Sequence, residues 1–341
     1  MDKITLDIPH SLNPVCCMVS GVSDQYEWKT GNALPRYYLF WASGMCGFAY
    51  IKNSRAVPPR MVFFGANPES QYKSICGMMN CSVVKYEGLG FASTLARIKN
   101  AVSLGFPVVI GPLDMFYLPY LKHYQTSHIP IHYIMVIGFD ANGVIVYDCD
   151  RVDAQPVEYD LLQQALDVHV PGVGVRNTIR IFHWPKAIPS IEEIAAKSLA
   201  EKCAFMLRPP ISNLGVPGMR KLAREVLRWP EELSEEEVSA SLKGMVKYMD
   251  DRFEGRSFDG GRIRFAREYL AATSEILRVA ELKRLEREYR ESGAILDSAA
   301  KGILRQTYSF QGVSESLLRV ADIEEGIYRK IEGILEGAVY G

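Results

Sequence analysis

Cys16 and Cys17 stand side by side where the sequence predicts the start of a helix, and His132 and Asp148 stand at the ends of two predicted strands. A cysteine nucleophile needs a stabilised thiolate, a base that accepts its proton, and a group that orients the base. A helix N-terminus supplies the first through its free amides and its dipole. His132 can act as the base and Asp148 as its orienting partner. These residue types are suited to attack by a thiolate on an acyl carbon.

Each of these residues also has a structural explanation. A histidine at a strand end is usually a surface residue or a hydrogen-bonded core residue, and an aspartate after a strand usually forms a turn. Adjacent cysteines in a helix are usually small core residues. No spacing rule links a nucleophile to a base far along the chain. Residue types and spacing alone therefore leave both explanations open.

A hairpin is predicted by the segment HIPIHYIMVIGFDANGVIVYDCD, residues 128–150, because Asn142-Gly143 is a strong turn signal between two apolar runs. In this hairpin His132 and Asp148 lie at about the same height, so a side chain from each can meet on one face. The two side chains must also point to the same side of the sheet. A bulge in either strand would change that.

The composition indicates a globular protein without an electrostatic bias. Apolar residues make up 48% of the 341 residues and charged residues 23%, and the formal net charge is −1. This charge gives no indication of nucleic-acid or anionic-membrane binding. The sequence begins without a basic region and apolar core, and no apolar run approaches the roughly 18 residues of a membrane span. We expect a cytoplasmic protein that binds neither nucleic acid nor membrane.

The seven cysteines argue against a disulfide framework, because their number is odd and their spacing irregular. Cys76 and Cys81 are separated by four residues and have no matching second pair, which is a weak zinc signal. We expect no metal site, and we expect most of the thiols to be small buried residues.

Two domains are expected, residues 1–186 and 187–341. The first holds most of the Gly, Pro, Tyr and Cys with several β-rich runs, whereas the second is rich in Glu, Arg, Ala and Leu at helical spacing. Ser190 and Glu193 form a predicted capping box where the second domain begins.

The expected fold class is α+β: an N-terminal helix opened by Pro14 and an antiparallel sheet, followed by a mostly α-helical domain. In the helical domain a second capping box is predicted at Ser234 and Glu237. The run after it reads as one long helix, or as two helices broken near Gly293.

Several segments together resemble the butirosin-biosynthesis BtrH family. They are LFWASGMCGFAYI, then FPVVIGPLDMFYLPY, then the strand with His132 and the hairpin GFDANGVIVYDCD, in that order. In the second half, FDGGRIRFAREYLAATSEI is similar to the helical domain that commonly follows. The resemblance covers most of the chain, and its motifs are specific together but weak singly.

The resemblance implies a papain-like cysteine-protease fold used for acyl transfer. Cys17 matches the nucleophile, His132 the base and Asp148 the orienting carboxylate. The family often has His-Cys at the first helix where this chain has Cys16-Cys17, so Cys16 stays an alternative nucleophile. The family also often has glycines where Pro130-Ile131 stands here, which could narrow the acyl pocket.

The activity implied by the resemblance is amide synthesis. An acyl carrier protein would deliver the acyl group as a phosphopantetheine thioester, and a small amine would accept it. No bound cofactor or metal is implied. Two other functions stay open: a cysteine peptidase or amidase with the same residues, and a non-catalytic scaffold that keeps the fold. The helical domain could cover the cleft or form a homodimer interface.

The remaining candidate residues would bind the substrate or the oxyanion. Papain-like folds usually place a side-chain amide shortly before the nucleophile, and Asn13 is the amide at that place, although it could equally cap the helix. Asp114 could meet the incoming amine or cap a turn. Tyr117 could line an acyl pocket or pack in the core. Gly44 and Phe48 could lie beside the catalytic helix or a pantetheine arm.

Overall fold

The computed structural model describes residues 3–14, 16–44, 46–63, 67–249 and 261–340, and the chain divides into two compact units. The first unit comprises residues 1–39 and 67–189, and the second comprises residues 40–66 and 190–341. The division therefore falls after Pro189. Residues 40–66 group with the helical unit, although they lie within the predicted first domain.

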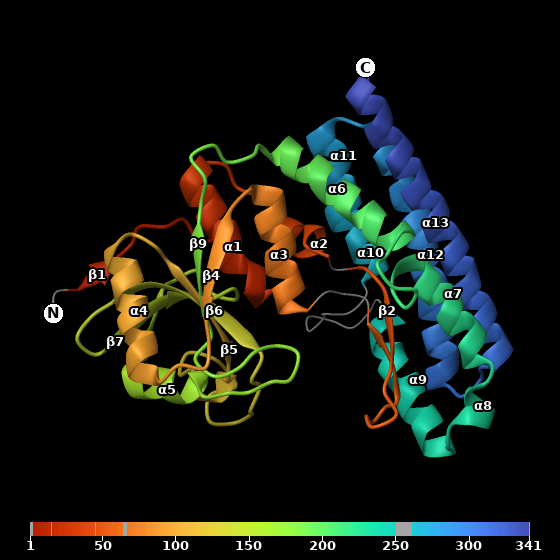
Figure 1. Ribbon diagram of the computed structural model, residues 1–341, viewed down its shortest axis with the longest axis horizontal. Coiled ribbons are helices and arrows are strands. Elements are labelled where there is room, and N and C mark those ends of the chain that lie inside the picture. Colours follow the sequence, from red (N-terminus) through yellow and green to blue (C-terminus); the bar gives the residue numbers. More distant parts are fainter. Residues whose placement is uncertain (1–2, 15, 45, 64–66, 250–260, 341) are drawn as a thin grey trace. The chain divides into compact units, whose positions relative to one another are not determined.

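The first unit is built on a seven-stranded antiparallel sheet in the order β4-β9-β5-β6-β7-β8, with β1 paired to β6 (Figure 1). The predicted α+β class, an N-terminal helix followed by an antiparallel sheet, is confirmed. The strands are β1 (Ile4–Thr5), β4 (Ser82–Tyr86), β5 (Val108–Leu113), β6 (His132–Phe139), β7 (Gly143–Tyr147), β8 (Gln155–Glu158) and β9 (Ile179–His183).

Helices cover the two faces of this sheet. They are α1 (Cys17–Thr30), α3 (Pro68–Met79), α4 (Phe91–Ser103), the short η1 (Met115–Tyr117) and α5 (Tyr159–Leu166). Ile134 and Val136 of β6 belong to a large apolar core with residues of α4 and α5. Met135 and Ile137, which point to the other face, form a smaller cluster with Ile8. This alternation is the period of two expected for a strand buried on both faces.

α1 lies directly against β6. A β-carbon placed on Gly21 would come within 2.9 Å of Cβ of Met135, so only glycine allows the helix to approach this closely. The side chain of Gln25 spans two neighbours, because its amide donates to Sδ of Met135 at 3.6 Å and its carbonyl accepts from Nε1 of Trp184 at 3.1 Å. The helix begins at Cys17, not at Pro14 as predicted.

The second unit is mostly helical, and Figure 1 shows its two longest helices lying lengthwise beside each other. Both predicted capping boxes form, at Ser190 with Glu193 and at Ser234 with Glu237. The helices are α6 (Ile191–Leu207), α7 (Gly215–Val226), α8 (Trp229–Glu232), α9 (Glu235–Met249), α10 (Arg262–Phe265), the π-helical η2 (Ala266–Leu270), α11 (Ala271–Leu277), α12 (Ala280–Leu304) and α13 (Phe310–Tyr340).

The described residues follow neither predicted alternative, one long helix or two helices broken near Gly293. The chain instead breaks at Arg278, which has a left-handed φ of 56°, and α12 continues through Gly293. A β-carbon on Gly293 would lie 2.8 Å from Cγ1 of Ile263, so this glycine serves close helix packing. The parts of the predicted helices that fall on residues 250–260 lie outside the described residues.

Residues 40–66 join the helical unit through contacts of their own. α2 (Tyr38–Ala42) leads into β2 (Ala49–Lys52) and β3 (Arg60–Phe63), which pair as a two-stranded sheet. β2 contacts α7 and β3 contacts α9. Tyr50 and Lys52 of β2 both bind the carboxylate of Glu225, the lysine at 3.0 Å. These contacts explain why the segment groups with helices far along the sequence.

A buried ion pair ties the last helix to the middle of this unit. The guanidinium of Arg262 donates to the carboxylate of Glu324, which also accepts a hydrogen bond from the hydroxyl of Ser292 at 3.1 Å. Both charged side chains are almost fully buried. Removing one partner of such a pair would leave an uncompensated buried charge. In the described parts of the chain, none of the helices is both long and apolar enough to cross a membrane.

Gly111 on β5 offers a test of how tightly the sheet is packed. Its φ is +145°, and an added β-carbon would lie 2.6 Å from the backbone oxygen of His132. We predict that Gly111→Ala lowers the free energy of unfolding by more than about 2 kcal/mol, because strain and overlap both oppose it. Urea unfolding followed by circular dichroism measures this. Gly90→Ala, at φ −67° with no atom within 4 Å, should cost less than about 1 kcal/mol. Equal losses would contradict the prediction.

Candidate active site

A β-bulge brings the side chains of His132 and Asp148 to one face of the sheet. Near the turn, Gly138 pairs with Ile145, whereas beyond the bulge Met135 pairs with Tyr147. If the register of Met135 with Tyr147 continues by one residue, Asp148 lies opposite residue 134. Residues 134 and 132 are two apart in the strand, so their side chains point to the same face. In the first register Asp148 would face residue 135, on the opposite side. The extra residue in β6 therefore makes the meeting of the two side chains possible.

His132 and Asp148 form a buried ion pair. Nε2 of His132 lies 2.9 and 2.7 Å from the two carboxylate oxygens of Asp148. The exposed fractions of the two residues are 7% and 1%. Burial lowers the pKa of the imidazole, but the charges of Asp148 and Cys17 and hydrogen bonds to both outweigh it, so the pKa of His132 is raised well above its ordinary value. The structure thus favours an imidazolium.

Asp148 is held by two further donors. The hydroxyl of Tyr120 donates to Oδ2 at 2.9 Å, and the backbone amide of Cys149 donates to Oδ1 at 2.7 Å. Burial alone would raise the pKa of this carboxyl, but His132, Tyr120 and the Cys149 amide together lower it. With each oxygen bonded twice, the carboxylate has a fixed orientation and holds the imidazole in turn.

Cys17, not Cys16, carries the accessible thiol beside His132. Cys17 is the first residue of α1 and is half-buried, whereas Cys16 precedes the helix and is fully buried. Burial and the neighbouring Cys17 raise the pKa of the Cys16 thiol. Cys17 lies close enough to His132 to help raise the pKa of the imidazole. Because Nε2 faces Asp148, Nδ1 is the ring nitrogen available to the sulfur.

A layer of aromatic and cationic side chains packs next to the first turn of α1. The hydroxyl of Tyr72 donates to the carbonyl of Met18 at 2.8 Å. The guanidinium of Arg180, which is 2% exposed, lies 4.7 Å from the Tyr72 ring centre and 5.9 Å from that of Tyr133. It also donates to the carbonyl of Gly111 at 3.1 Å. This layer links α1, β5, β6 and β9 next to Cys17.

A second histidine–aspartate pair fixes the strand end that carries Asp148. Nδ1 of His10 lies 2.7 Å from the carboxylate of Asp24 in α1, and Nε2 lies 3.1 and 2.7 Å from the carbonyls of Asp148 and Arg151. Burial opposes charge on His10, but Asp24 and the two carbonyls outweigh it and raise its pKa. The ring also stacks on Tyr147 at 4.2 Å. The pair thereby connects α1 to the backbone of Asp148.

Asn13 lies shortly before α1 and lines a cavity of about 420 Å³ beside that helix. It is 7% exposed, and its side-chain oxygen has no hydrogen-bond partner among the described residues. The alternative that Asn13 caps the helix is wrong, because the N-cap is Cys16 and no side chain caps the helix. The backbone of Asn13 is fixed by a 2.7 Å bond to the carbonyl of Cys149. Its amide side chain is therefore not used in capping.

Asp114 and Tyr117 both make structural contacts within the first unit. The carboxylate of Asp114 accepts from the amides of Phe116 and Ile129 at 3.1 and 2.9 Å, and it pairs with Nδ1 of His128 at 2.6 Å. These are the bonds of a turn cap. Tyr117 is half-buried and packs against the main apolar core. Asp114 thus makes the contacts of a turn cap, and Tyr117 those of a core residue.

Gly44 and Phe48 belong to the second unit, and the structure does not group them with Cys17, His132 and Asp148. The Phe48 side chain is 1% exposed, and its carbonyl accepts from the amide of Gly215 at 2.9 Å. Its ring lies against Gly218 of α7, where an added β-carbon would come within 3.1 Å. Gly44 has a φ of 103°, so it occupies a conformation that favours glycine.

From the sequence, no role at the site was assigned to Tyr120, His10, Tyr72 or Arg180. Each acts through a contact between residues far apart in the chain, which periodicity does not reveal. One signal was available: Arg180 stands within an apolar run, and a buried arginine needs polar partners. All seven cysteines are free thiols, and the described residues contain no group of three or more His, Cys, Asp or Glu placed to hold a metal ion.

Comparisons with known proteins match both parts of the chain. Residues 16–149 match the family described as "Butirosin biosynthesis protein H, N-terminal", and residues 162–331 match a domain of unknown function, DUF4872. The crystal structure of a protein described as a C39-like peptidase from Bacillus anthracis is 13% identical, covers 55% of this chain and 100% of its own, and gives a TM-score of 0.36. That score is too low to carry an argument about function. The sequence has no significant match among curated proteins.

We predict that Asp148→Asn lowers the pKa of the His132 imidazole, because burial then acts without the carboxylate that opposes it. A histidine-selective NMR titration of the folded protein measures this pKa. Asp153→Asn, at an exposed loop position of the same unit, should leave it within about 0.2 of the wild-type value. An unchanged His132 pKa in Asp148→Asn would show that another group sets it.

We also predict that iodoacetamide labels Cys17 and leaves Cys16 largely unreacted in the folded protein at neutral pH, because Cys16 is buried and its thiol is harder to ionise. His132→Ala should slow the labelling of Cys17 by about tenfold or more, since the nearby base and positive charge are lost. Peptide mapping by mass spectrometry follows each thiol. Cys76, which is also half-buried, is the internal reference. Preferential labelling of Cys16 would move the nucleophile to that residue.

Proposed function

We propose that this protein, whose residues 16–149 match the family described as "Butirosin biosynthesis protein H, N-terminal", is a cysteine-dependent acyltransferase of a biosynthetic pathway. In this proposal it takes an acyl group from a carrier-protein thioester and passes it to an amine, forming an amide. The observation that carries the proposal is the set Cys17, His132 and Asp148, with a half-buried thiol on a helix N-terminus and a buried ion pair behind it.

The first half-reaction forms an acyl-enzyme. The thiolate of Cys17 attacks the carbonyl carbon of the thioester, which is already activated, so no nucleotide is consumed. The negative charge that develops on the carbonyl oxygen faces the free amides at the start of α1, including that of Cys17. Asn13, whose side chain is not used in capping, is the proposed second donor. The bond to the pantetheine sulfur breaks, and that sulfur takes the proton from His132.

The second half-reaction forms the amide and restores the enzyme. The amine attacks the carbonyl carbon of the acyl-enzyme, and neutral His132 accepts a proton from the amine nitrogen. The bond to the sulfur of Cys17 breaks, which returns the thiolate and the imidazolium to their starting state. Asp148, fixed by Tyr120 and the Cys149 amide, keeps the imidazole oriented through both steps.

The same residues support hydrolysis if water replaces the amine, so a cysteine peptidase or amidase is the second candidate function. The two reactions share the acyl-enzyme and differ in the acceptor that reaches it. A chain that has only kept the fold would form no acyl-enzyme. The covalent intermediate therefore separates the two enzymes from the scaffold, and the product separates transfer from hydrolysis.

We predict that incubation with short-chain acyl thioesters of pantetheine adds one acyl mass to the wild-type protein, located on Cys17. Cys17→Ala should abolish the adduct, His132→Ala should slow its formation by about a hundredfold or more, and Cys16→Ala should retain most of it. Intact-protein mass spectrometry and peptide mapping measure this. Addition of a panel of small amines should then release amides.

The outcomes of this experiment are distinct. Free acid as the sole product, with every amine tested, would favour the peptidase or amidase function. Acylation that survives Cys17→Ala would place the nucleophile elsewhere. A protein that forms no adduct with free pantetheine thioesters should next be offered acyl groups on carrier proteins, and a lack of any adduct there would contradict the acyltransferase proposal.

A further inference from the structure

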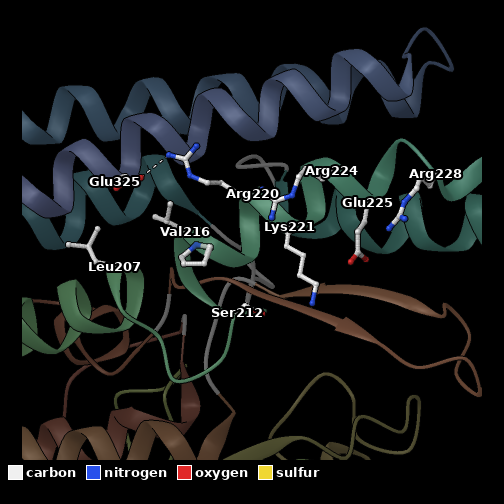
Figure 2. Close-up of a pocket in the computed structure, with 10 residues that line it drawn as sticks. Leu207, Ser212, Val216, Arg220, Lys221, Arg224, Glu225, Arg228 and Glu325 are labelled. Carbon is white, nitrogen blue, oxygen red and sulfur yellow. Dashed lines mark hydrogen bonds and ion pairs between the residues drawn. The ribbon is translucent and has the colours of Figure 1, made fainter.

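The second unit contains a pocket of about 710 Å³ whose lining is divided by chemistry. Figure 2 shows the lining residues, which come mainly from α7. At one end lie the apolar side chains of Leu207 and Val216, and the basic side chains of α7 follow toward Arg228 at the other end. Pro217 also lines the pocket. The volume falls within the range of about 300–1,000 Å³ that is typical of small-molecule sites. The proposed active site does not use this pocket.

The basic side chains repeat at helical spacing. Arg220, Arg224 and Arg228 are four residues apart, and Lys221 adjoins the first of them. Residues four apart lie on the same face of a helix, where like charges destabilise it by about 0.2–0.5 kcal/mol for each pair. Arg220 and Arg224 form such a pair on α7, whereas Arg228 lies beyond the end of this helix, just before α8. The question is which of these cations already have an anionic partner.

Two of the four cations are partnered by acids and two are not. Arg220 pairs with Asp322 and Glu325 at 2.6 and 2.7 Å, and Arg228 pairs more loosely with Glu232 at 3.4 Å. Lys221 donates to the neutral side chain of Asn213 at 2.6 Å. Arg224 is exposed and makes no ion pair with the residues that the structure describes.

The two carboxylates in the lining do not supply the missing charge. Glu225 is bound by Lys52 at 3.0 Å and by the hydroxyl of Tyr50. Glu325 is bound by Arg220 and also by Arg329 at 2.6 Å. Both acids are already neutralised by other cations, and Lys221 acts on Glu225 only through its charge, without an ion-pair contact among the described residues. The hydrogen-bond donors of Arg224 and Lys221 are therefore available to a ligand.

We propose that this pocket binds a small molecule in which a phosphate or diphosphate group is joined to an apolar portion. The guanidinium of Arg224 would bind the phosphate oxygens in a fork and the Lys221 ammonium would add a point charge. Leu207, Val216 and Pro217 would cover the apolar portion. A phosphate ligand suits this set better than a single carboxylate, because one carboxylate neutralises only one of the two available cations. The inference is independent of the proposed acyl transfer.

The test uses the full-length protein and four probes: inorganic pyrophosphate, inorganic phosphate, phenyl phosphate and citrate. Isothermal titration calorimetry at about 0.15 M salt, where weak surface attraction is screened, measures binding. We expect one saturable site for pyrophosphate, and we expect phenyl phosphate to bind several-fold more tightly than phosphate. Arg224→Gln should weaken pyrophosphate binding by about tenfold or more, and Lys221→Gln by several-fold.

The matched control is Arg287→Gln, which removes the same charge from an exposed position of α12 in the same unit. It should change affinity by less than about twofold, because the long-range effect of one exposed charge is screened. Absence of saturable pyrophosphate binding, or equal weakening by both arginine variants, would overturn the proposal. Citrate binding as tightly as pyrophosphate would overturn the phosphate assignment. Equal affinities for phosphate and phenyl phosphate would overturn the assignment of the apolar portion.

Discussion

The buried pair of His132 and Asp148 is the interaction around which the first unit is organised. Burial opposes charge on both side chains, so the pair is stable only with accurate geometry and further hydrogen bonds. Tyr120 and the Cys149 amide supply those bonds. Because the pKa of the imidazole is raised in the fold, His132 stabilises the fold below pH 6.5. This contribution is lost as the pH rises through the pKa that His132 has in the folded protein. Because the pKa of the carboxyl is lowered in the fold, Asp148 stabilises the fold above pH 3.8. This contribution is lost as the pH falls through the pKa that Asp148 has in the folded protein.

The elements around the site follow local rules, which is why the sequence predicted them. Asn142-Gly143 specifies the hairpin turn, and the capping box at Ser190 marks the start of α6. The pairing of side chains does not follow local rules. The bulge in β6 determines whether Asp148 lies on the same face as His132, and the sequence of neither strand predicts the bulge. Contacts such as that of Tyr120 with Asp148 or of Tyr72 with Met18 join residues far apart in the sequence, so they depend on the tertiary fold.

Residues 40–66 show a different limit of sequence reasoning. They follow α1 closely in the sequence, so Gly44 and Phe48 were expected beside the catalytic helix or a pantetheine arm. In the structure β2 and β3 pack on α7 and α9, and Phe48 lies in the core of the helical unit. The close approach of Phe48 to Gly218 explains its burial without reference to a substrate. Order along the chain was a poor guide because the second unit is assembled from two separate segments.

The bulge also sets how strand length can vary in this fold. Removing one residue from β6 would let the ladder with β7 run in a single register and would restore regular hydrogen bonds. The same deletion would turn Asp148 to the face opposite His132, because side chains alternate along a strand. A single insertion or deletion in the paired strands of this hairpin therefore separates Asp148 from His132. Two such changes that compensate each other keep both side chains on one face. A chain that keeps all three residue types could still lack the site if its hairpin were one residue shorter.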